Sequence, residues 1–387
     1  MIVPSNRLAL MMTGFVRLRN GKMGFGLLRY SENPIACVIA ADEVSSGGLP
    51  GQTLRELTGI NTDVPIVADV AAARDLGADT LVIAVATSGG ILPDGYREAI
   101  LMALRLGMNV VNGLHGRYAD DPEYRAALVT GAPIRLAGRE KHQPMGLEAE
   151  RSWGPSASEE AWIWDVRTEP AGLFSGRGRA RGLPARRVLT VGTDMAIGKM
   201  TASLELDRAA RALGLRSKFL ATGQIGICIS GDGVPLDAVR VDFASGSIEG
   251  LCVKYGHDHD VLWVEGQGSA LHPGSTAWVP LLRGSMATDL VLVHRAGQKV
   301  LDGFGGSDGS TEVVIPPLQE VIALYEAAAA ASPSFLAAKV RGIALNCARL
   351  SPAEIEVACG EVEAETGLVC VDVVHHGAQR LLAAILG

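Results

Sequence analysis

The segment "VGTDMAIGKMTAS", at residues 191–203, has the residue types of a loop that binds phosphate groups. Five residues separate Gly192 from Gly198, Lys199 begins a helical pattern, and the apolar run VLTV before the loop is a strand pattern. Strand, glycine loop and helix in this order are typical of a P-loop, where backbone N–H groups and the helix dipole attract an anion. The sequence therefore predicts a cofactor-binding site made of Gly192, Thr193, Asp194, Gly198, Lys199, Met200 and Thr201.

Two features depart from the common P-loop pattern. That pattern has four residues between the glycines, and a Ser or Thr after the lysine places its hydroxyl on Mg²⁺. Here Met200 follows Lys199, and the hydroxyl of Thr201 lies one residue later, about 100° further round the helix. We therefore expect the loop to bind phosphates better than it transfers them, and we predict no metal site.

The segment "VLWVEGQGSALHPG", at residues 261–274, contains two candidate catalytic residues. Glu265 ends an apolar strand pattern, where a carboxylate beside a P-loop commonly holds Mg²⁺ or acts as a base. His272 follows in the same loop, and an imidazole has an ordinary pKa near neutrality, which suits a general base. We predict that Glu265 and His272 are catalytic. The structural alternatives are an acid that caps the next turn and an exposed loop histidine.

Candidate substrate-binding residues follow other predicted strands. In the segment VLVHRAG, at residues 291–297, Arg295 comes just after a strand pattern. It can pair with a carboxylate through two hydrogen bonds, although a structural salt bridge is an equal alternative. Gln267 offers an amide donor. In the glycine-rich region 221–249, Gln224 and Asp242 are expected at strand ends that face the P-loop, although Gly-Asp-Gly also makes ordinary turns.

Short apolar runs alternate with helical patterns in the first part of the chain. The segments 35–42, 80–90 and 108–116 have strand patterns, and residues 94–107 have apolar residues at helical spacing. This alternation predicts a parallel sheet with helices on its faces. We therefore predict an α/β fold class, with a Rossmann-like N-terminal domain at residues 1–150.

A connection and a second α/β domain follow. Residues 151–186 are rich in Gly, Pro, Ser and charge, and we interpret the basic cluster from Arg177 to Arg187 as a solvated linker beside a phosphate site. From residue 187 to 387, further strand and helix patterns alternate after the P-loop. They predict a P-loop NTPase-like domain with a parallel sheet.

Composition restricts the classes of partner. Hydrophobic residues make up 48% of the 387 residues, and the net charge of −7 gives no support to nucleic-acid binding. The apolar run near the N-terminus is short and is interrupted by Arg17, so we expect neither a signal peptide nor a membrane span. The six cysteines are scattered without a Cys-x-x-Cys motif, which is typical of reduced thiols. We expect a cytoplasmic homo-oligomer that acts on small-molecule substrates.

Several segments together resemble the DgcN family, whose members are assigned as D-glutamate N-acetyltransferases. The resemblance is carried by "GTDMAIGKMTASLELDRAARALG", "ATGQIGICISGDGVPLDAV", "VEGQGSALHPG" and the N-terminal "ADTLVIAVATSGGILPDGYREAILMALRLGMNVVNGLH". It covers nearly the whole chain, and Gly-Lys-Met-Thr is itself typical of the family. The resemblance implies a Rossmann-like domain, a P-loop domain, acetyl-CoA as the donor and D-glutamate as the acceptor. Coenzyme A carries phosphates that a P-loop can bind without cleaving them.

The C-terminal domain also resembles dethiobiotin synthetase, which has Gly-Thr-Asp, five intervening residues and Gly-Lys in its loop. This resemblance leaves two alternatives open. One is a kinase or ligase in which Lys199, Thr201, Asp242 and Glu265 serve Mg²⁺ and ATP. The other is a nucleotide-binding regulator without turnover. Met200 stands where dethiobiotin synthetase has threonine, which weighs against the first alternative.

Overall fold

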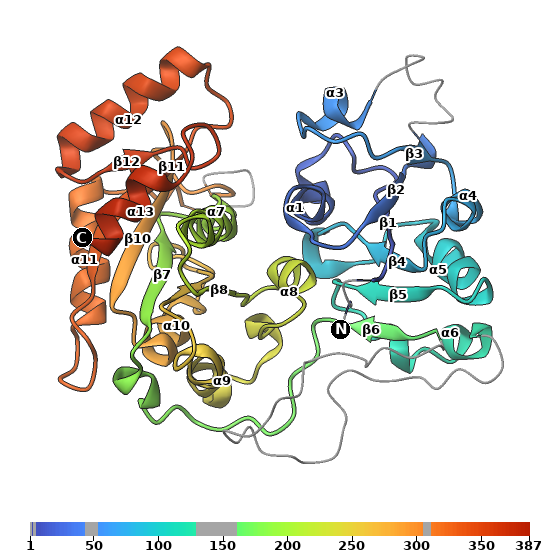
Figure 1. Cartoon of the computed structure of the whole chain (residues 1–387), viewed down its shortest axis with the longest axis horizontal. Helices are drawn as coiled ribbons and strands as arrows, with labels where there is room; N and C mark the ends of the chain where they lie inside the picture. Colours follow the sequence, from blue (N-terminus) through green and yellow to red (C-terminus); the bar gives the residue numbers. More distant parts are fainter. Residues whose placement is uncertain (1, 3–4, 43–52, 129–160, 305–310) are drawn as a thin grey trace. The chain divides into compact units, whose positions relative to one another are not determined.

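The computed structural model describes residues 2, 5–42, 53–128, 161–304 and 311–387, and these form two compact units. The first unit contains the described residues up to Gly172 together with Gln224–Ala238, and the second contains Leu173–Gly223 and Val239–Gly387. Each unit has one six-stranded parallel sheet covered by helices (Figure 1). The predicted α/β fold class is therefore confirmed.

The sheet of the first unit has the strand order β3-β2-β1-β4-β5-β6, which is the order of a complete Rossmann fold. Every neighbouring pair in it is parallel. Its strands are β1 (Leu8–Met11), β2 (Ile35–Ile39), β3 (Ile66–Val67), β4 (Thr80–Ile83), β5 (Asn109–Asn112) and β6 (Ile163–Asp165).

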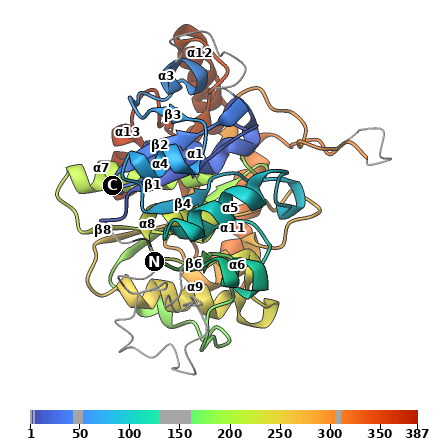
Figure 2. The same cartoon turned by 90° about the vertical axis from the view of Figure 1, so that its right-hand side faces the viewer.

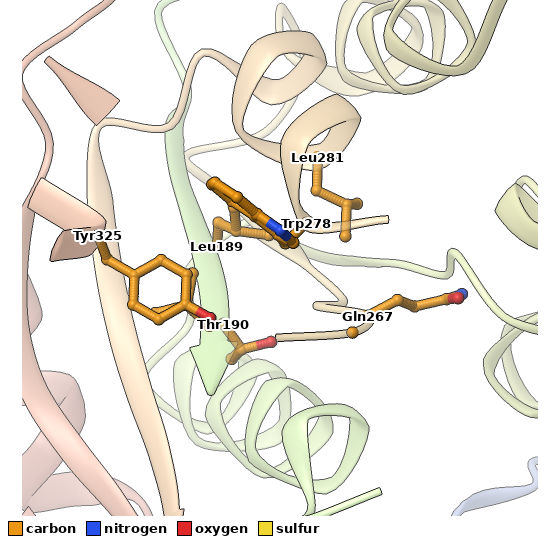
Figure 3. Close-up of a pocket in the computed structure, with 8 residues that line it drawn as sticks. Leu189, Thr190, Gln267, Trp278, Leu281 and Tyr325 are labelled. Carbon is orange, nitrogen blue, oxygen red and sulfur yellow. The ribbon is translucent and has the colours of Figure 1, made fainter. Parts of the chain in front are cut away.

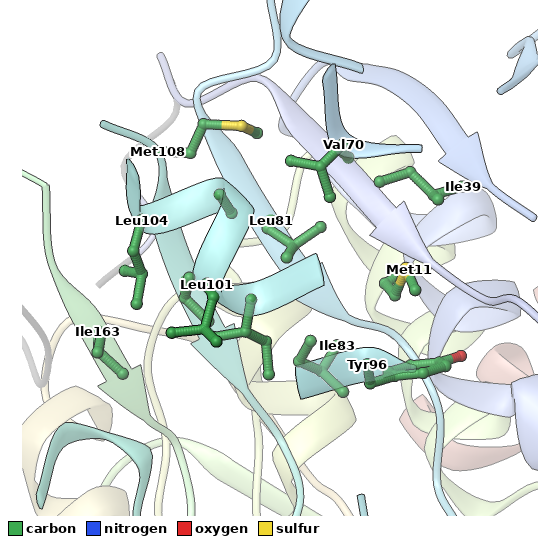
Figure 4. Close-up of a cluster of buried hydrophobic side chains, with 14 of the residues drawn as sticks. Met11, Ile39, Val70, Leu81, Ile83, Tyr96, Leu101, Leu104, Met108 and Ile163 are labelled. Carbon is green, nitrogen blue, oxygen red and sulfur yellow. The ribbon is translucent and has the colours of Figure 1, made fainter. Parts of the chain in front are cut away.

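Helices lie on both faces of this sheet. Helices α4, α5 and α6 follow one another on one face, and α1 packs with α8 on the other (Figures 1 and 2). Leu101 and Leu104 of α5 are buried among strand residues such as Leu81 and Ile163 (Figure 4). The helices are α1 (Lys22–Tyr30), α3 (Leu54–Thr58), α4 (Val70–Asp75), α5 (Tyr96–Arg105), α6 (Pro122–Ala127) and α8 (Gln224–Ser230).

The sheet of the second unit has the order β12-β11-β10-β7-β9-β8, again with parallel neighbours throughout. Its strands are β7 (Arg186–Gly192), β8 (Ser217–Leu220), β9 (Val261–Val264), β10 (Asp289–Arg295), β11 (Lys339–Asn346) and β12 (Cys370–Val371). Strand β7 lies between β9 and β10, so the loop that follows it opens beside the carboxyl ends of both neighbours. This is where open α/β sheets usually bind ligands.

The helices of the second unit divide between the two faces of its sheet. Helices α7 and α13 pack against each other and share an apolar core with the strands, whereas α9, α10 and α11 contact the strands and one another on the opposite face. Helix α12 lies beside α11. The helices are α7 (Lys199–Ala212), α9 (Val241–Tyr255), α10 (Trp278–Ser285), α11 (Leu318–Ala329), α12 (Pro352–Thr366) and α13 (Gln379–Leu386).

Two segments fall outside the units in which the sequence prediction placed them. Residues 151–186 were predicted as a connection, yet β6 within them pairs with β5 of the first sheet. Residues 224–238 were predicted in the second domain, yet they group with the first unit, where α8 packs against α1.

Helix α9 begins in the glycine-rich region 221–249, where the sequence predicted strand ends. Glycine and serine are poor helix formers, and here they allow close packing instead. A Cβ at Gly246 would lie 1.7 Å from the carbonyl oxygen of Phe174, and one at Gly284 of α10 would lie 2.4 Å from that of Ser245. The small residues therefore mark a close helix contact.

The basic cluster that leads into β7 is only in part the solvated linker that the sequence predicted. Arg179 forms an ion pair at 2.7 Å with Glu249, whose side chain is 1% exposed. The guanidinium of Arg187, also 1% exposed, donates hydrogen bonds to four backbone carbonyls. These belong to Leu183, Ala185, Ser285 and Met286. The prediction was wrong for Arg187, which fixes the start of the P-loop strand, whereas Arg177, Arg179 and Arg181 are exposed as predicted.

No helix in the described part of the chain has the length and apolar character needed to cross a bilayer.

Replacing Arg187 by methionine tests this anchor. The variant leaves four buried carbonyls without their donors, and each such group costs about 1–3 kcal/mol. We expect Arg187→Met to lower the free energy of unfolding by at least about 3 kcal/mol in urea titrations. Arg208→Met is the control, because Arg208 is a mostly exposed partner of Glu205, and it should change the value by less than about 0.5 kcal/mol. Equal effects of the two variants would contradict this role.

Candidate functional site

The predicted P-loop joins β7 to α7 at the carboxyl edge of the second sheet. Gly198 caps the helix with a φ of 116°, a backbone conformation that disfavours any side chain. Ala196 has a φ of 52°, which is uncommon for a residue with a Cβ. The loop therefore has the tight, partly strained conformation of an anion-binding turn.

Lys199 is buried in this loop and bonds to it. Its side chain is 6% exposed, and its Nζ donates a hydrogen bond of 2.7 Å to the carbonyl oxygen of Asp194. Burial lowers the pKa of the ammonium group to about 8, although the carboxylates of Asp194 and Glu265 act in the opposite direction. The lysine is therefore a positive charge confined to the loop at neutral pH, and an anion can replace its bond to the carbonyl.

The Asp194 carboxylate holds a second segment against the P-loop. One oxygen accepts the N–H of Met195 at 2.6 Å. The other accepts Nε2 of Gln298 at 2.7 Å and the N–H of Asp302 at 2.9 Å. Asp194 was predicted as a cofactor-binding residue, and its carboxylate shapes the loop through these three bonds.

Two side chains hold the ends of the loop. The hydroxyl of Tyr325 donates to the carbonyl oxygen of Gly192 at 2.7 Å and accepts the N–H of Ala270 at 2.9 Å. Nδ2 of Asn346, at the end of β11, donates to the carbonyl oxygen of Ile197 at 2.8 Å. The loop is therefore held in place by α11, β11 and the segment after β9.

Thr193 bonds to a histidine at the end of β10. Its Oγ1 lies 2.9 Å from Nδ1 of His294, and both side chains are buried. Burial, together with the charge of neighbouring Arg295, lowers the pKa of His294 to about 4. His294 is therefore a neutral hydrogen-bonding partner of the loop at pH 7.

Glu265 lies directly after β9 and is 6% exposed. Its Oε2 accepts the backbone N–H groups of Thr222 and Gly223 at 2.8 and 3.1 Å. The Thr222 hydroxyl in turn donates to the carbonyl oxygen of Glu265 at 2.8 Å. Glu265 thus joins the end of β8 to the end of β9. Its negative charge acts to raise the pKa of Lys199, against the effect of burial. Its catalytic role stays a prediction.

Gln267 and the aromatic pair beside it line a small cavity (Figure 3). The rings of Trp278 and Tyr325 meet edge to face with centroids 6.2 Å apart. The side chain of Gln267 extends away from them, and its Nε2 donates to the carbonyl oxygen and, at 3.2 Å, to the hydroxyl of Thr222. The cavity holds about 10 Å³, enough for about one water molecule and too little for a substrate.

His272 is placed as a hydrogen-bond acceptor. Its Nδ1 accepts the N–H of Gly274 at 3.1 Å, and its ring meets that of Phe304 edge to face at 5.1 Å. A neutral imidazole that accepts at Nδ1 carries its proton on Nε2. This arrangement makes Nε2 a donor, so it does not favour the general-base role predicted for His272.

Arg295 forms an internal ion pair beside the loop. Its guanidinium donates to Asp302 at 2.7 Å and to the carbonyl oxygen of Ala196 at 3.5 Å. The structural alternative, a salt bridge, is therefore present in this structure. Binding of a substrate carboxylate by Arg295 stays a prediction, and it requires exchange with Asp302.

Gln224 and Asp242 are not at strand ends, contrary to the prediction. Gln224 is the first residue of α8, in the first unit, whereas the P-loop belongs to the second. Asp242 is exposed in the first turn of α9. The many glycines of this region weaken the helical pattern of α8 and α9, so the sequence did not predict these helices and placed both residues at strand ends. Met200 and Thr201 are half-buried in the first turn of α7.

Four residues beside the loop were not predicted as site members: His294, Gln298, Tyr325 and Asn346. Strand-end position was the available signal for His294 and Asn346, because parallel strands end at one edge of a sheet. Gln298 and Tyr325 gave no signal, because their positions depend on the path of the loop after β10 and on helix α11.

One group among the described residues has the spacing of metal ligands, namely Glu356, His375 and His376. It is exposed, and Nε2 of His376 lies 2.9 Å from Glu356. Nδ1 of His376 accepts the N–H of Asp372 at 3.2 Å, so Nε2 carries the proton that Glu356 accepts. A metal ion would have to displace that proton. We therefore interpret the group as a surface hydrogen bond between His376 and Glu356.

Two family models match the chain. One, described as a domain of unknown function (DUF1611_C) P-loop domain, matches residues 175–382. The other, described as a domain of unknown function (DUF1611_N) Rossmann-like domain, matches residues 48–135.

The chain is also similar to individual proteins over most of its length. It is 35% identical over 317 residues to a D-glutamate N-acetyltransferase of Tritonibacter scottomollicae. The aligned region covers 81% of this chain and 83% of the relative. It is 32% identical to a protein of the same name from a Pseudoalteromonas species, over 80% of this chain and 82% of the relative. A crystal structure of a DUF1611 family protein from Anabaena variabilis is 47% identical, with a TM-score of 0.85 and 99% of both chains covered.

The pKa of Lys199 predicts how anion binding depends on pH. The ammonium is charged below pH 8 and loses its proton as the pH rises through that value. We expect the affinity for pyrophosphate, measured by calorimetry, to fall by about tenfold from pH 7 to pH 9. In Lys199→Arg the guanidinium stays charged over this range. Any change in affinity between pH 7 and pH 9 in this variant therefore comes from the ionisation of pyrophosphate itself. Parallel pH profiles of the two proteins would show that Lys199 does not bind the anion.

Proposed function

Since the chain belongs to the DUF1611 family, in which a Rossmann-like domain precedes a P-loop domain, we propose that it is a D-glutamate N-acetyltransferase. The two relatives that carry this name match about four fifths of the chain at 32–35% identity. The donor in this proposal is acetyl-CoA, and the P-loop holds its phosphates. The observation that carries the proposal is the buried Lys199 in a loop suited to an anion.

The residues of the loop suit phosphate binding without phosphate transfer. Acetyl transfer breaks no phosphate bond, so it needs no metal ion on the phosphates. Met200 takes the position at which a Ser or Thr would bind Mg²⁺. The loop N–H groups, the N-terminus of α7 and the Lys199 ammonium together supply the donors and the positive charge that a diphosphate needs.

Acetyl transfer needs an uncharged amine and an oriented thioester. The ammonium group of D-glutamate first loses a proton, and its nitrogen then forms a bond to the thioester carbonyl carbon. The C–S bond breaks, and coenzyme A leaves as a thiolate that takes up a proton. The nitrogen loses a second proton as the amide forms, so one proton is released overall.

We assign the removal of the first proton to Glu265. It is a buried carboxylate that lies near enough to Lys199 for their charges to interact, so it belongs to the same edge of the sheet as the phosphate site. Gln267 and Arg295 are the candidate donors for the two carboxylates of glutamate. Arg295 has a guanidinium that matches a carboxylate, once Asp302 releases it.

Thiol release from acetyl-CoA tests the function directly. The purified protein is given acetyl-CoA without ATP, and D-glutamate, L-glutamate and other amino acids are offered separately. We expect release that depends on D-glutamate. If the folded protein releases no thiol with any amino acid and instead hydrolyses ATP in the presence of Mg²⁺, it is a kinase or ligase and the proposal is wrong.

Glu265→Gln tests the assignment of the base. We expect thiol release to fall by at least about 100-fold, the usual contribution of a general base, while the Kd of acetyl-CoA changes little. Glu320→Gln is the matched control, because Glu320 is an exposed carboxylate on α11. Unchanged release in Glu265→Gln would refute the assignment, and a loss in His272→Asn alone would give the role to His272.

A further inference from the structure

A groove of about 420 Å³ opens at the carboxyl ends of β10 and β11 in the second unit. It is lined by residues of the segments 294–299, 315–318 and 358–365, together with Leu345. The loop after β10, the beginning of α11 and one side of α12 therefore form its walls. Its volume falls within the range of about 300–1,000 Å³ that is usual for small-molecule sites.

Two lining residues of the groove also bond to the P-loop. His294 bonds to Thr193 at 2.9 Å, and Gln298 bonds to the carboxylate of Asp194 at 2.7 Å. Each of these residues therefore contacts the P-loop and the groove at once. These two side chains separate the groove from the P-loop, and a ligand that spans both sites passes over them.

Gln298 leaves a buried acceptor in this wall without a partner. Its Oε1 is buried and has no hydrogen-bond partner among the described residues. The orientation of the amide is fixed, because Nε2 donates to Asp194 and, at 3.0 Å, to the carbonyl oxygen of Val300. An unpaired buried acceptor costs free energy, and a rotation of the Gln298 side chain toward the groove would offer Oε1 to an N–H donor of a ligand.

The other lining residues define the kind of ligand. Ile315, Leu318, Leu345 and Val362 contribute apolar surface. The charged lining residues are Glu361 and Glu365 against one lysine, Lys299, so the groove gives no attraction to a further phosphate group. A suitable ligand group is uncharged, largely apolar and carries N–H donors.

We propose that this groove binds the pantetheine arm of the acyl donor while the P-loop binds the diphosphate. The arm has two amide N–H groups and an apolar dimethyl carbon, and it bears no charge. The adenosine end of coenzyme A carries a further phosphate, which the two glutamates disfavour. This inference rests on the proposed function, because it takes acetyl-CoA as the donor.

A tryptophan at Ala358 tests the groove without touching the P-loop. Ala358 lines the groove from α12, so the indole of Ala358→Trp fills it. Val357→Trp is the matched control, because Val357 precedes it on the same helix, is 61% exposed and does not line the groove. Circular dichroism and thermal melting establish that both variants are folded.

The probes are coenzyme A, 4′-phosphopantetheine, adenosine 3′,5′-bisphosphate and pyrophosphate, titrated by calorimetry. In Ala358→Trp we expect the affinity for coenzyme A and 4′-phosphopantetheine to fall by at least about tenfold, which is the loss of a well-packed apolar group and a hydrogen bond. Pyrophosphate and adenosine 3′,5′-bisphosphate should bind unchanged, and Val357→Trp should bind all four probes as the wild type does.

Three other outcomes overturn the inference, and they are distinguishable. Loss of adenosine 3′,5′-bisphosphate alone would assign the groove to the adenosine end. Undiminished binding of every probe by Ala358→Trp would show that the donor does not enter the groove, and it would leave the proposed function intact. Failure of the wild type to bind coenzyme A while it binds pyrophosphate would overturn the proposed function and this inference together.

Discussion

The hydrogen bond from the Lys199 ammonium to the carbonyl oxygen of Asp194 is the interaction on which the candidate site depends. A charged group that is 6% exposed is costly to bury, and it persists only where the surrounding structure pairs it. Three features place Lys199 beside the Asp194 carbonyl: β7 ends where the loop begins, Gly198 allows the chain to turn, and α7 begins at the lysine. The fully buried Arg187 serves this arrangement from the far end of β7, where it fixes the beginning of the strand.

Asp194 connects that lysine to the rest of the carboxyl edge. Its carbonyl oxygen holds Lys199, while its carboxylate holds Gln298 and the backbone of Asp302. The conformation of the segment after β10 is thus tied to the conformation of the P-loop. A ligand that draws the lysine away from Asp194 alters the same residue that positions the wall of the groove. Phosphate binding and binding in the groove therefore share one structural link.

Much of the fold could be predicted from the sequence, because its strands are apolar runs that alternate with helices. Strands β2, β4 and β5 and the helix α5 in the first unit, and β7, β9 and β10 in the second, lie where their patterns predicted them. Strand β1 (Leu8–Met11) was not predicted, because the apolar run near the N-terminus was considered only as a signal peptide or a membrane span. Helix α9 was not predicted, because its Gly and Ser residues serve helix packing and resemble a loop.

The candidate site was only partly predictable. The glycine spacing and the lysine locate the P-loop from local sequence alone, and Glu265 follows from its place after a strand. The contacts of Arg295, His272 and Gln298 depend on segments that meet only in the folded chain. No pattern in the sequence indicates that Asp302 pairs with Arg295 or that Gly274 occupies Nδ1 of His272. These partners decide whether a polar residue is available for chemistry.

In the proposed function, this P-loop holds the phosphates of an acyl donor and needs no metal ion to do so. The most direct measurement is a calorimetric titration of coenzyme A into the wild-type protein, once in EDTA and once with saturating Mg²⁺. We expect the same Kd in both titrations, because in this proposal Lys199, the loop N–H groups and the α7 N-terminus supply the whole phosphate site. Binding that appears only with Mg²⁺ would contradict it.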